Sequence, residues 1–303
     1  MSELTAQIFN IQHFSTEDGP GVRTTVFFQG CPLRCAWCAN PESQRAVPQL
    51  AHRAAVCVRC GCCLQSCPRG ALSVREGKIA IDRALCEVCG ECVEVCPSHA
   101  MFFYGERRTL DAVWDEVLRD RGFYETSGGG VTCSGGECML QPDFVGELFR
   151  RCREEGIHTA LDTCGAFPPA HIGRVLPYTD LFLYDLKNMD SRLHKLATGV
   201  PNELILENAQ KIAKAGGKFQ IRIPMIPLFN DSQESFEQFG KFILTLGDAV
   251  EVVQLLPYHK MGTVKWERLQ RHNKVFESVP PKDELVQARK AYLESLGLNV
   301  MIH

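Results

Sequence analysis

The sequence has no apolar run of the roughly 18–20 residues that a membrane-spanning helix needs. It also has no large excess of charge, since 33 Lys and Arg residues stand against 36 Asp and Glu residues in 303, a formal net charge of −3. This balance argues against a protein that binds nucleic acid mainly by electrostatic attraction. The N-terminal residues lack the basic and long apolar regions of a secretory signal. We therefore expect a cytoplasmic protein that contacts neither nucleic acid nor membrane.

Cysteine, in contrast, is abundant. The chain has 16 cysteines, and the 40 residues from Cys57 to Cys96 contain nine of them. In the reducing cytosol, clustered thiols more often bind metal than form disulfides. Metal binding is therefore the first function to test against the spacing of these residues.

Outside this dense stretch, β-rich apolar runs alternate with segments that have apolar residues at helical spacing. This alternation predicts a parallel sheet with right-handed crossovers. About six strand–helix units, fewer than the eight of a complete barrel, indicate an incomplete α/β barrel. The expected strands are Arg23–Gln29, Val131–Ser134, Ile157–Asp162, Leu181–Leu186, Lys218–Ile226, Glu251–Pro257 and a short one near Leu298–Ile302. The expected helices are Leu110–Asp120, Phe144–Glu155, Leu204–Ala215, Phe236–Leu246 and Glu284–Leu296.

The cysteine-rich stretch interrupts this rhythm after the first strand and predicts an inserted domain. We place a small α+β domain at residues 49–104, with a short strand at Lys78–Ile81, and the main domain at residues 1–48 and 105–303. Pro41 and Pro48 mark the point where the chain leaves the main domain, and Gly105 marks its return.

The insert contains the spacing C-x2-C-x2-C-x3-C-P twice, which is typical of ferredoxins with two [4Fe–4S] clusters. In that pattern the fourth cysteine of each run binds the cluster of the other run. One predicted ligand set is Cys57, Cys60, Cys63 and Cys96, and the other is Cys67, Cys86, Cys89 and Cys92. Two four-cysteine zinc sites are the alternative. Cys62 fits neither spacing and is expected to bind no iron.

A second cysteine pattern, C-x3-C-x2-C, directly follows the first expected strand and consists of Cys31, Cys35 and Cys38. Three thiolates can hold three irons of a cube and leave the fourth open to a substrate or cofactor, as in catalytic metal sites that keep an open position. Taken alone, the triplet could also be a zinc knuckle.

The triplet resembles the signature of the radical S-adenosylmethionine (SAM) superfamily. Nearly the whole chain is similar, in the same order of motifs, to the activating enzymes of glycyl radical enzymes. The branch it resembles is pyruvate formate-lyase activating enzyme-like and carries a two-cluster ferredoxin-like insert. The matching segments are 18–23, 28–31, 37–41, 128–132, 134–137, 157–163, 184–187, 221–224 and 256–259.

The resemblance implies a radical SAM partial (β/α)6 barrel with a ferredoxin-like insert and three [4Fe–4S] clusters. It implies that the open iron chelates SAM and that one electron cleaves the sulfonium. The resulting 5′-deoxyadenosyl radical would remove hydrogen from a glycine of a partner glycyl radical enzyme. The cofactor would carry the difficult chemistry while the protein positions it. A reduced flavodoxin or ferredoxin is the implied electron donor, with the insert clusters as a possible relay to the triplet.

The resemblance also implies the residues that contact SAM. They are Trp37, Cys38, Ala39, Gly135, Gly136, Glu137, Asp185, Leu186, Lys187, Arg222 and His259. Simpler roles remain open for some: a glycine-rich turn for 134–137, an ion pair for Asp185 and Lys187, a structural salt bridge for Arg222 and a turn for His259. Asp185 and Lys187 are two residues apart on a strand and so face the same side.

Three further expectations concern neighbouring residues. Asp162 and Thr163 match a position linked in some members to a monovalent cation. Asp18, in the loop 18–23, is the candidate contact to the glycine-bearing segment, and the loop Lys260–Ser278 with the insert surface is expected to select the partner. The remaining cysteines are expected to be small buried apolar residues rather than ligands: Cys133, Cys138, Cys152 and Cys164.

Two other functions remain open on the sequence alone. One is a radical SAM enzyme that acts on a small molecule. The other is an iron–sulfur electron-transfer protein, which would leave the Cys31–Cys35–Cys38 triplet and Ser134–Glu137 without a role.

Overall fold

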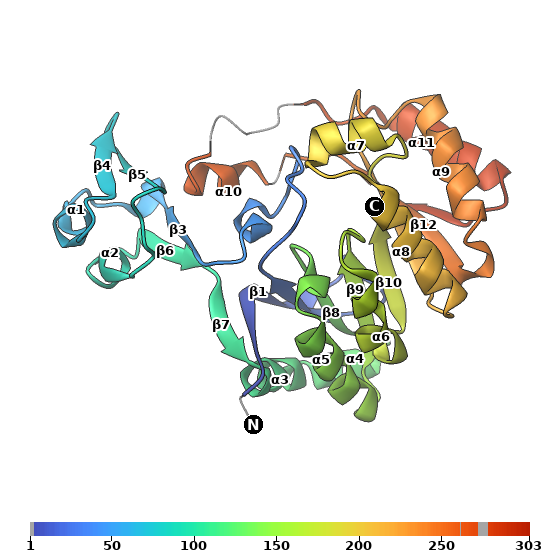
Figure 1. Cartoon of the computed structure of the whole chain (residues 1–303), viewed down its shortest axis with the longest axis horizontal. Helices are drawn as coiled ribbons and strands as arrows, with labels where there is room; N and C mark the ends of the chain where they lie inside the picture. Colours follow the sequence, from blue (N-terminus) through green and yellow to red (C-terminus); the bar gives the residue numbers. More distant parts are fainter. Residues whose placement is uncertain (1–2, 261, 272–277) are drawn as a thin grey trace.

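The computed structural model describes residues 3–260, 262–271 and 278–303 (Figure 1). Its centre is a nine-stranded sheet. The strands run in the order β13 (Val300–Ile302), β12 (Val250–Pro257), β11 (Phe219–Met225), β10 (Leu181–Asp185), β9 (His158–Thr163), β8 (Gly130–Gly135), β2 (Arg23–Phe28), β1 (Thr5–Ser15) and β7 (Glu106–Thr109).

The sheet is mostly parallel, because all neighbours from β2 to β13 pair in parallel and only β1 is antiparallel to β2 and β7. The expected α/β alternation is confirmed, and the parallel strands lie within two residues of their predicted bounds. The strand β1 was not predicted, because the alternation of buried apolar residues along it is limited to Ala6 and Ile8 in its first half. The partial barrel stays a prediction.

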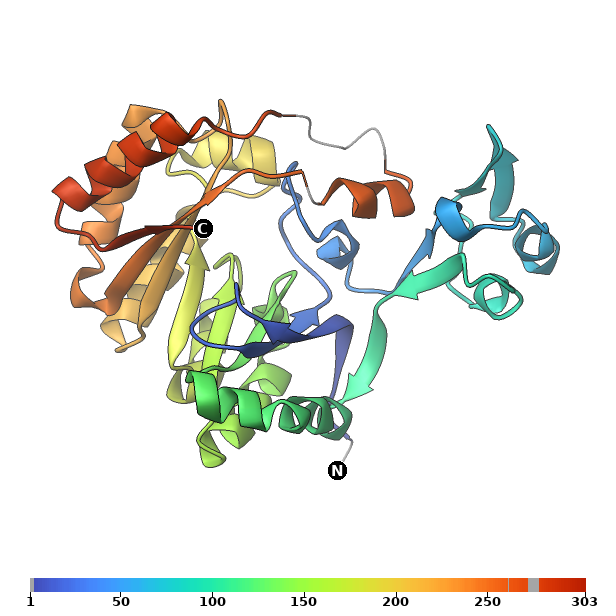
Figure 2. The ribbon, with the colours of Figure 1, turned by 180° about the vertical axis from the view of Figure 1, so that it is seen from behind.

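Helices cover one face of the sheet (Figures 1 and 2). They are α3 (Leu110–Arg119), α4 (Arg121–Ser127), α5 (Pro142–Glu154), α6 (Ile172–Val175), α8 (Glu203–Lys214), α9 (Gln233–Leu244) and α11 (Asp283–Ser295). A further helix, α7 (Ser191–Thr198), lies at the carboxyl ends of the strands (Figure 1). Side-chain caps begin three of these helices: Thr109 for α3, Asp190 for α7 and Ser232 for α9. No helix in the described ranges is both long and apolar enough to span a bilayer.

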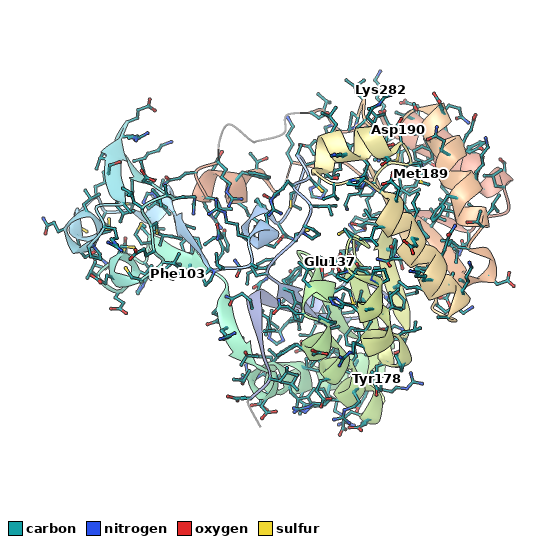
Figure 3. All side chains as sticks on the ribbon, in the orientation of Figure 1. Phe103, Glu137, Tyr178, Met189, Asp190 and Lys282 are labelled. Carbon is teal, nitrogen blue, oxygen red and sulfur yellow. The ribbon has the colours of Figure 1, made fainter. Side chains whose placement is uncertain are left out.

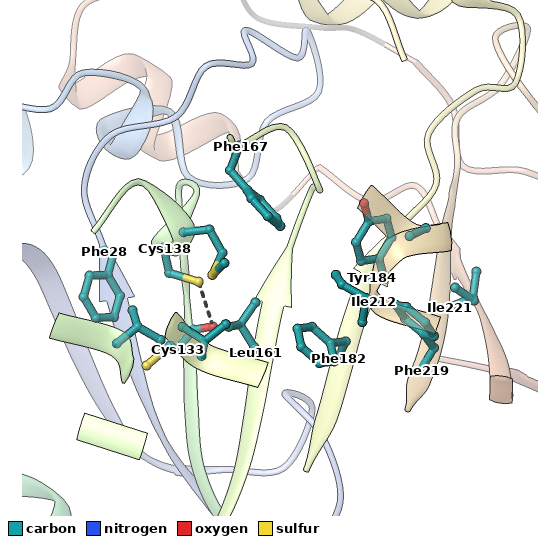
Figure 4. Close-up of a cluster of buried hydrophobic side chains, with 14 of the residues drawn as sticks. Phe28, Cys133, Cys138, Leu161, Phe167, Phe182, Tyr184, Ile212, Phe219 and Ile221 are labelled. Carbon is teal, nitrogen blue, oxygen red and sulfur yellow. Dashed lines mark hydrogen bonds between the residues drawn. The ribbon is translucent and has the colours of Figure 1, made fainter. Parts of the chain in front are cut away.

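The main core lies between these helices and the sheet (Figure 4). Strand residues that face the helices are apolar, such as Cys133, Leu161 and Phe182, all fully buried. Their neighbours Ser134 and Asp162 point to the opposite face, since side chains alternate along a strand. The face without helices is therefore the one that presents polar groups at the carboxyl ends of the strands.

Residues 49–104 form two small antiparallel sheets and two short helices beside the main sheet (Figure 1). The elements are β3 (Gln49–His52), α1 (Cys62–Ser66), β4 (Leu72–Arg75), β5 (Lys78–Ile81), α2 (Glu91–Glu94) and β6 (Met101–Tyr104). Pairing of β3 with β6 brings the two ends of this segment together. We call residues 49–104 the insert.

The two halves of the insert repeat in backbone conformation as well as in sequence. Positive φ angles occur at matching positions: Arg59 (58°) and Val88 (60°), Gly61 (78°) and Gly90 (94°), Gly70 (58°) and His99 (49°). A positive φ is unusual for a β-branched residue such as Val88, and strained positions of this kind cluster at functional sites. The repeat thus extends to the shape of the cysteine loops.

Candidate functional site

Four charged side chains meet on the polar face at the carboxyl ends of β9, β10 and β11. Arg222 Nη2 lies 2.5 Å from Asp162 Oδ1, and Arg222 Nε lies 2.9 Å from Asp185 Oδ1. Lys187 Nζ lies 2.7 Å from Asp185 Oδ2. Ser134 donates to the other Asp162 oxygen at 2.6 Å. We call Asp162, Asp185, Lys187 and Arg222 the charged network; adjacent parallel strands bring its members together.

The network is largely withdrawn from solvent, since its side chains are only 10–15% exposed. Burial alone would lower the pKa of Lys187, but the Asp185 carboxylate raises it above the ordinary value. Burial likewise opposes the charge of Arg222, and Asp162 and Asp185 raise its pKa. Against the effect of burial, Arg222 and Lys187 lower the pKa of Asp185. The site therefore holds two cations and a carboxylate in their charged forms.

The Cys31–Cys38 loop lies next to this network. Cys35 is buried, and although burial raises the pKa of its thiol, the charge of Lys187 acts to lower it. Burial raises the pKa of Cys38 to about 11, with Lys187 again acting in the opposite direction. Lys187 is thus near enough to favour the thiolate forms that bind metal.

Contacts from distant segments hold this loop. The Arg34 and Ala36 amides donate to the Thr198 and Ala197 carbonyls at the end of α7. On the other side, α10 (Thr263–Arg268) supplies Trp266, whose indole N–H donates to the Cys38 carbonyl at 2.9 Å.

The glycine-rich loop after β8 packs against the start of the cysteine loop. A Cβ at Gly135 would lie 2.5 Å from backbone atoms of Phe28, and one at Gly136 would lie 2.2 Å from the Gly30 carbonyl oxygen. Only glycine permits such close approach. The loop backbone is therefore fixed beside the triplet and the charged network.

Glu137 is fully buried within this loop and lies at the strand ends (Figure 3). Its carboxylate accepts from the Met139 amide, the Thr163 hydroxyl and the Cys164 amide at 2.8–3.1 Å. Burial raises its pKa to about 7, against the effect of these hydrogen bonds. The side chain thus joins the loops that follow β8 and β9.

A small cavity brings together the remaining predicted contacts. Trp37, Cys38 and His259 line it with Tyr258, Gly262 and Trp266. The predicted His259 position after β12 is therefore next to the cysteine loop. Ala39 lies beside it, because the Gly262 Cβ position is 3.0 Å from the Ala39 Cα. Trp266 was not found from sequence, since it is 228 residues from Cys38 and carries no local motif.

The four cysteines expected to be small buried residues, Cys133, Cys138, Cys152 and Cys164, are all buried. Cys164, however, also has polar contacts: its sulfur lies 2.9 Å from the Glu137 carboxylate. It packs in a small cluster with Leu33 and Cys35, with Cys31 against it. Cys164 is thus a neighbour of the triplet as well as a small buried residue.

The loop 18–23 folds against the polar face of the sheet. Asp18 accepts from Ser15 at 2.6 Å and from Thr25 at 2.9 Å, and its carbonyl accepts from Thr132. The negative charge of Asp18 contributes to raising the pKa of both Asp162 and Arg222. Arg23 is fully buried and donates to Thr132 and to the Pro20 and Val131 carbonyls, so it supports the loop.

Two cavities in the insert separate its eight motif cysteines into two sets. One is lined by Cys57, Cys60, Cys63 and Cys96, and the other by Cys67, Cys86, Cys89 and Cys92. In each set the fourth cysteine comes from the other half of the repeat. Cys62 lines neither cavity. In the described part of the chain, no three His, Cys, Asp or Glu side chains are arranged to hold a single metal ion.

The described part of the loop Lys260–Ser278, whose role in partner selection stays a prediction, contacts the cysteine loop and the insert. Lys265 pairs with Asn40 at 2.6 Å and with Glu42 at 2.8 Å, and Gln270 bonds to the β5 backbone. Met261 and residues 272–277 lie outside the described residues.

Comparison with known proteins now defines the class. The model of the radical SAM superfamily matches residues 25–242. The solved domain of a pyruvate-formate lyase-activating enzyme from Bacteroides vulgatus is 34% identical, with a TM-score of 0.50, over 58% of this chain and 99% of that one. The fold is therefore the radical SAM α/β fold, with its large and mostly parallel sheet.

Curated relatives narrow the class. The choline trimethylamine-lyase activating enzyme of Oleidesulfovibrio alaskensis is 42% identical over 274 residues, 89% of this chain and 88% of that protein. The trans-4-hydroxy-L-proline dehydratase activating enzyme of Clostridioides difficile is 41% identical over 298 residues, 97% of this chain and 98% of that protein. The indoleacetate decarboxylase activating enzyme of Tractidigestivibacter scatoligenes is 39% identical over 312 residues, 99% of this chain and 98% of that protein. The chain belongs to the activating enzymes of glycyl radical enzymes within the radical SAM superfamily.

Proposed function

We propose that this protein generates the glycyl radical of a partner enzyme by reductive cleavage of SAM at a cluster held by Cys31, Cys35 and Cys38. The observation that carries the proposal is the juxtaposition of this triplet with the charged network and the glycine-rich loop. When bound, the cluster and SAM supply a one-electron reduction and a carbon radical able to abstract hydrogen from glycine.

The charged network fits the zwitterionic methionine end of SAM. Lys187 and Arg222 offer cations to its carboxylate, while Asp162 and Asp185 offer carboxylates to the N–H groups of its amine. Because Gly136 packs closely against Gly30, the backbone of the glycine-rich loop lies beside the cysteine loop, where it could contact the methionine end of SAM. The ion pairs within the network would hold these side chains in place before SAM binds, so they are compatible with a role in SAM binding.

The nucleoside end of SAM would lie against the small cavity between the cysteine loop and α10. Trp37 and His259 line it, and the Trp266–Cys38 hydrogen bond fixes one wall. Glu137 and Leu186 contribute chiefly by position, because both side chains are buried. Asp162 and Thr163 remain the candidate cation position.

The insert fits two [4Fe–4S] clusters, because each of its cavities is lined by four thiols from both halves of the repeat. We propose that residues 49–104 are a ferredoxin-like domain within a partial barrel made by residues 1–48 and 105–303. Its clusters would pass electrons from a reduced flavodoxin or ferredoxin to the triplet. Asp18, beside the charged network, would meet the glycine-bearing segment.

Anaerobic electron paramagnetic resonance on reconstituted, reduced protein, with iron counted, tests the proposal. We expect about twelve irons, four for each of three cubes, and a change in one cluster signal when SAM is added. Incubation with candidate glycyl radical enzymes should then produce a glycyl radical doublet. SAM cleavage coupled to change of a small metabolite, without any protein radical, would contradict it. About eight irons and no response to SAM would instead indicate an electron carrier.

A further inference from the structure

A broad groove separates the insert from α10 and the residues that follow it. Its volume is about 1190 Å³. One wall comes from the ends of β3, β4 and β5, and the other from residues 264–271. We call it the basic groove, because six cations line it: Arg53, Arg75, Lys78, Arg83, Arg268 and Arg271.

The positive charge of the groove is only partly balanced. Three carboxylates line it, those of Glu76, Asp82 and Glu267. Across the described ranges, none of the six cations forms an ion pair with an acidic side chain. Burial, and then the nearby Arg271, lower the pKa of Arg83 to about 10. This excess of six cations over three carboxylates favours a negatively charged occupant.

The groove adjoins the cavity lined by Cys57, Cys60, Cys63 and Cys96. His52, Ala54, Lys78 and Ile79 line both spaces, so the wall between them is one side chain thick. His52 is buried, and its Nε2 has no hydrogen-bond partner among the described residues. A protein seated in the groove would therefore lie close to the first four-cysteine site.

Hydrogen bonds fix the two walls relative to each other. Gln270 accepts from the Ile81 amide at 2.8 Å and donates to the Ile79 carbonyl at 2.5 Å. Arg83 donates to the Leu269 carbonyl at 2.7 Å. The groove is therefore formed before any partner binds, which lowers the cost of association.

We propose that the basic groove is the docking site of an acidic one-electron carrier protein that reduces the cluster of Cys57, Cys60, Cys63 and Cys96. The inference rests on the proposed function and adds to it the place where electrons enter. The carrier loses one electron, the cluster gains it, and no atom is transferred. Exposed Val56 and Val264 lie among the charges of the groove. This mixture suits a protein surface better than a small anion.

The test compares two variants of the full chain with equal change of charge. Arg53→Glu with Arg75→Glu reverses exposed charges in the groove, whereas Lys211→Glu with Lys214→Glu reverses exposed charges on the outer side of α8. We measure reduction of the reconstituted protein by reduced flavodoxin, and separately the affinity for oxidised flavodoxin. The groove variant should be reduced at least about 10-fold more slowly at low salt, with weaker binding, and the difference should shrink at about 0.5 M salt.

Reduction by dithionite, iron content and SAM cleavage with dithionite should match the unaltered protein in both variants. Equal rates of reduction by flavodoxin in all three proteins would overturn the proposal, as would equal slowing in both variants. If only glycyl radical formation with dithionite falls in the groove variant, the groove binds the protein substrate instead. If the unaltered protein does not cleave SAM with dithionite, the proposed function is contradicted. This outcome differs from those that overturn the groove proposal, so the two failures can be told apart.

Discussion

The cysteines of the Cys31–Cys38 loop and those of the insert lie in different surroundings. Among the described residues, the main core contains 41 buried apolar side chains, while the insert core contains eight, of which three are cysteines. The loop is thus held by a frame that folds on its own apolar core. We therefore expect the insert, with so small a core, to depend on its proposed clusters to fold, as other small metal-binding domains do.

The two regions also differ in charge. Lys187 lies near the thiols of the loop and belongs to a network with two carboxylates. In the insert, burial and then the charges of other cysteines raise the pKa of Cys63, against a backbone hydrogen bond that lowers it. A charged network suits a site that binds an ionic cofactor, and a cavity lined by four thiols suits a closed cluster.

Replacing a ligand of the loop should have the largest effect. Cys35→Ala should abolish SAM cleavage, because the open cluster would lose one of its three thiolates. About eight irons should remain, bound by the insert. The measurement is 5′-deoxyadenosine formation together with iron content. Cleavage at an ordinary rate in this variant would show that the loop is not the SAM site.

Removal of iron should affect the insert far more than the main sheet. Amide hydrogen exchange in the apoprotein should show complete loss of protection in β3, β5 and β6. Strands β9 to β11 should stay protected, because the apolar core beneath them contains no proposed iron ligand. Equal protection of both regions without iron would mean that the insert folds on its own apolar core.

Removing one carboxylate of the charged network should weaken SAM binding. Asp185→Asn leaves Arg222 and Lys187 without a shared partner, and truncating one member of a buried charge pair costs about 2–5 kcal/mol. We expect an affinity for SAM at least about 30-fold lower at that cost. Lys218→Ala, at the opposite end of the neighbouring strand, is the control. Unchanged SAM affinity in Asp185→Asn would restrict the network to a structural role.

The smallest expected effect is on iron content, which should differ between variants of the adjacent residues Cys62 and Cys63. Cys62→Ser should keep about twelve irons, whereas Cys63→Ser should lose about four, since only Cys63 lines the first four-cysteine cavity. Iron content and the spectrum of the reduced clusters provide the comparison. Loss of iron in Cys62→Ser with full iron in Cys63→Ser would reassign the ligand.

Much of this could be predicted from sequence because the signals are local. The parallel strands are continuous apolar runs, and the insert repeat has a fixed cysteine spacing. Asp185 and Lys187 could be paired in advance because they are two residues apart at the end of an expected strand, where alternate side chains face the same side. By contrast, the alternation in β1 was too short to reveal an antiparallel strand.

The sequence by itself determined the α/β order of elements and the three groups of motif cysteines, and it supplied the candidate residues for SAM. Only the tertiary structure decided how these parts meet. Arg222 joins two carboxylates from neighbouring strands, Trp266 reaches Cys38, and Gln270 ties α10 to the insert. These contacts connect residues 37 to 228 positions apart, so no local pattern could encode them. They form because parallel crossovers bring distant strand ends and loops to one edge of the sheet.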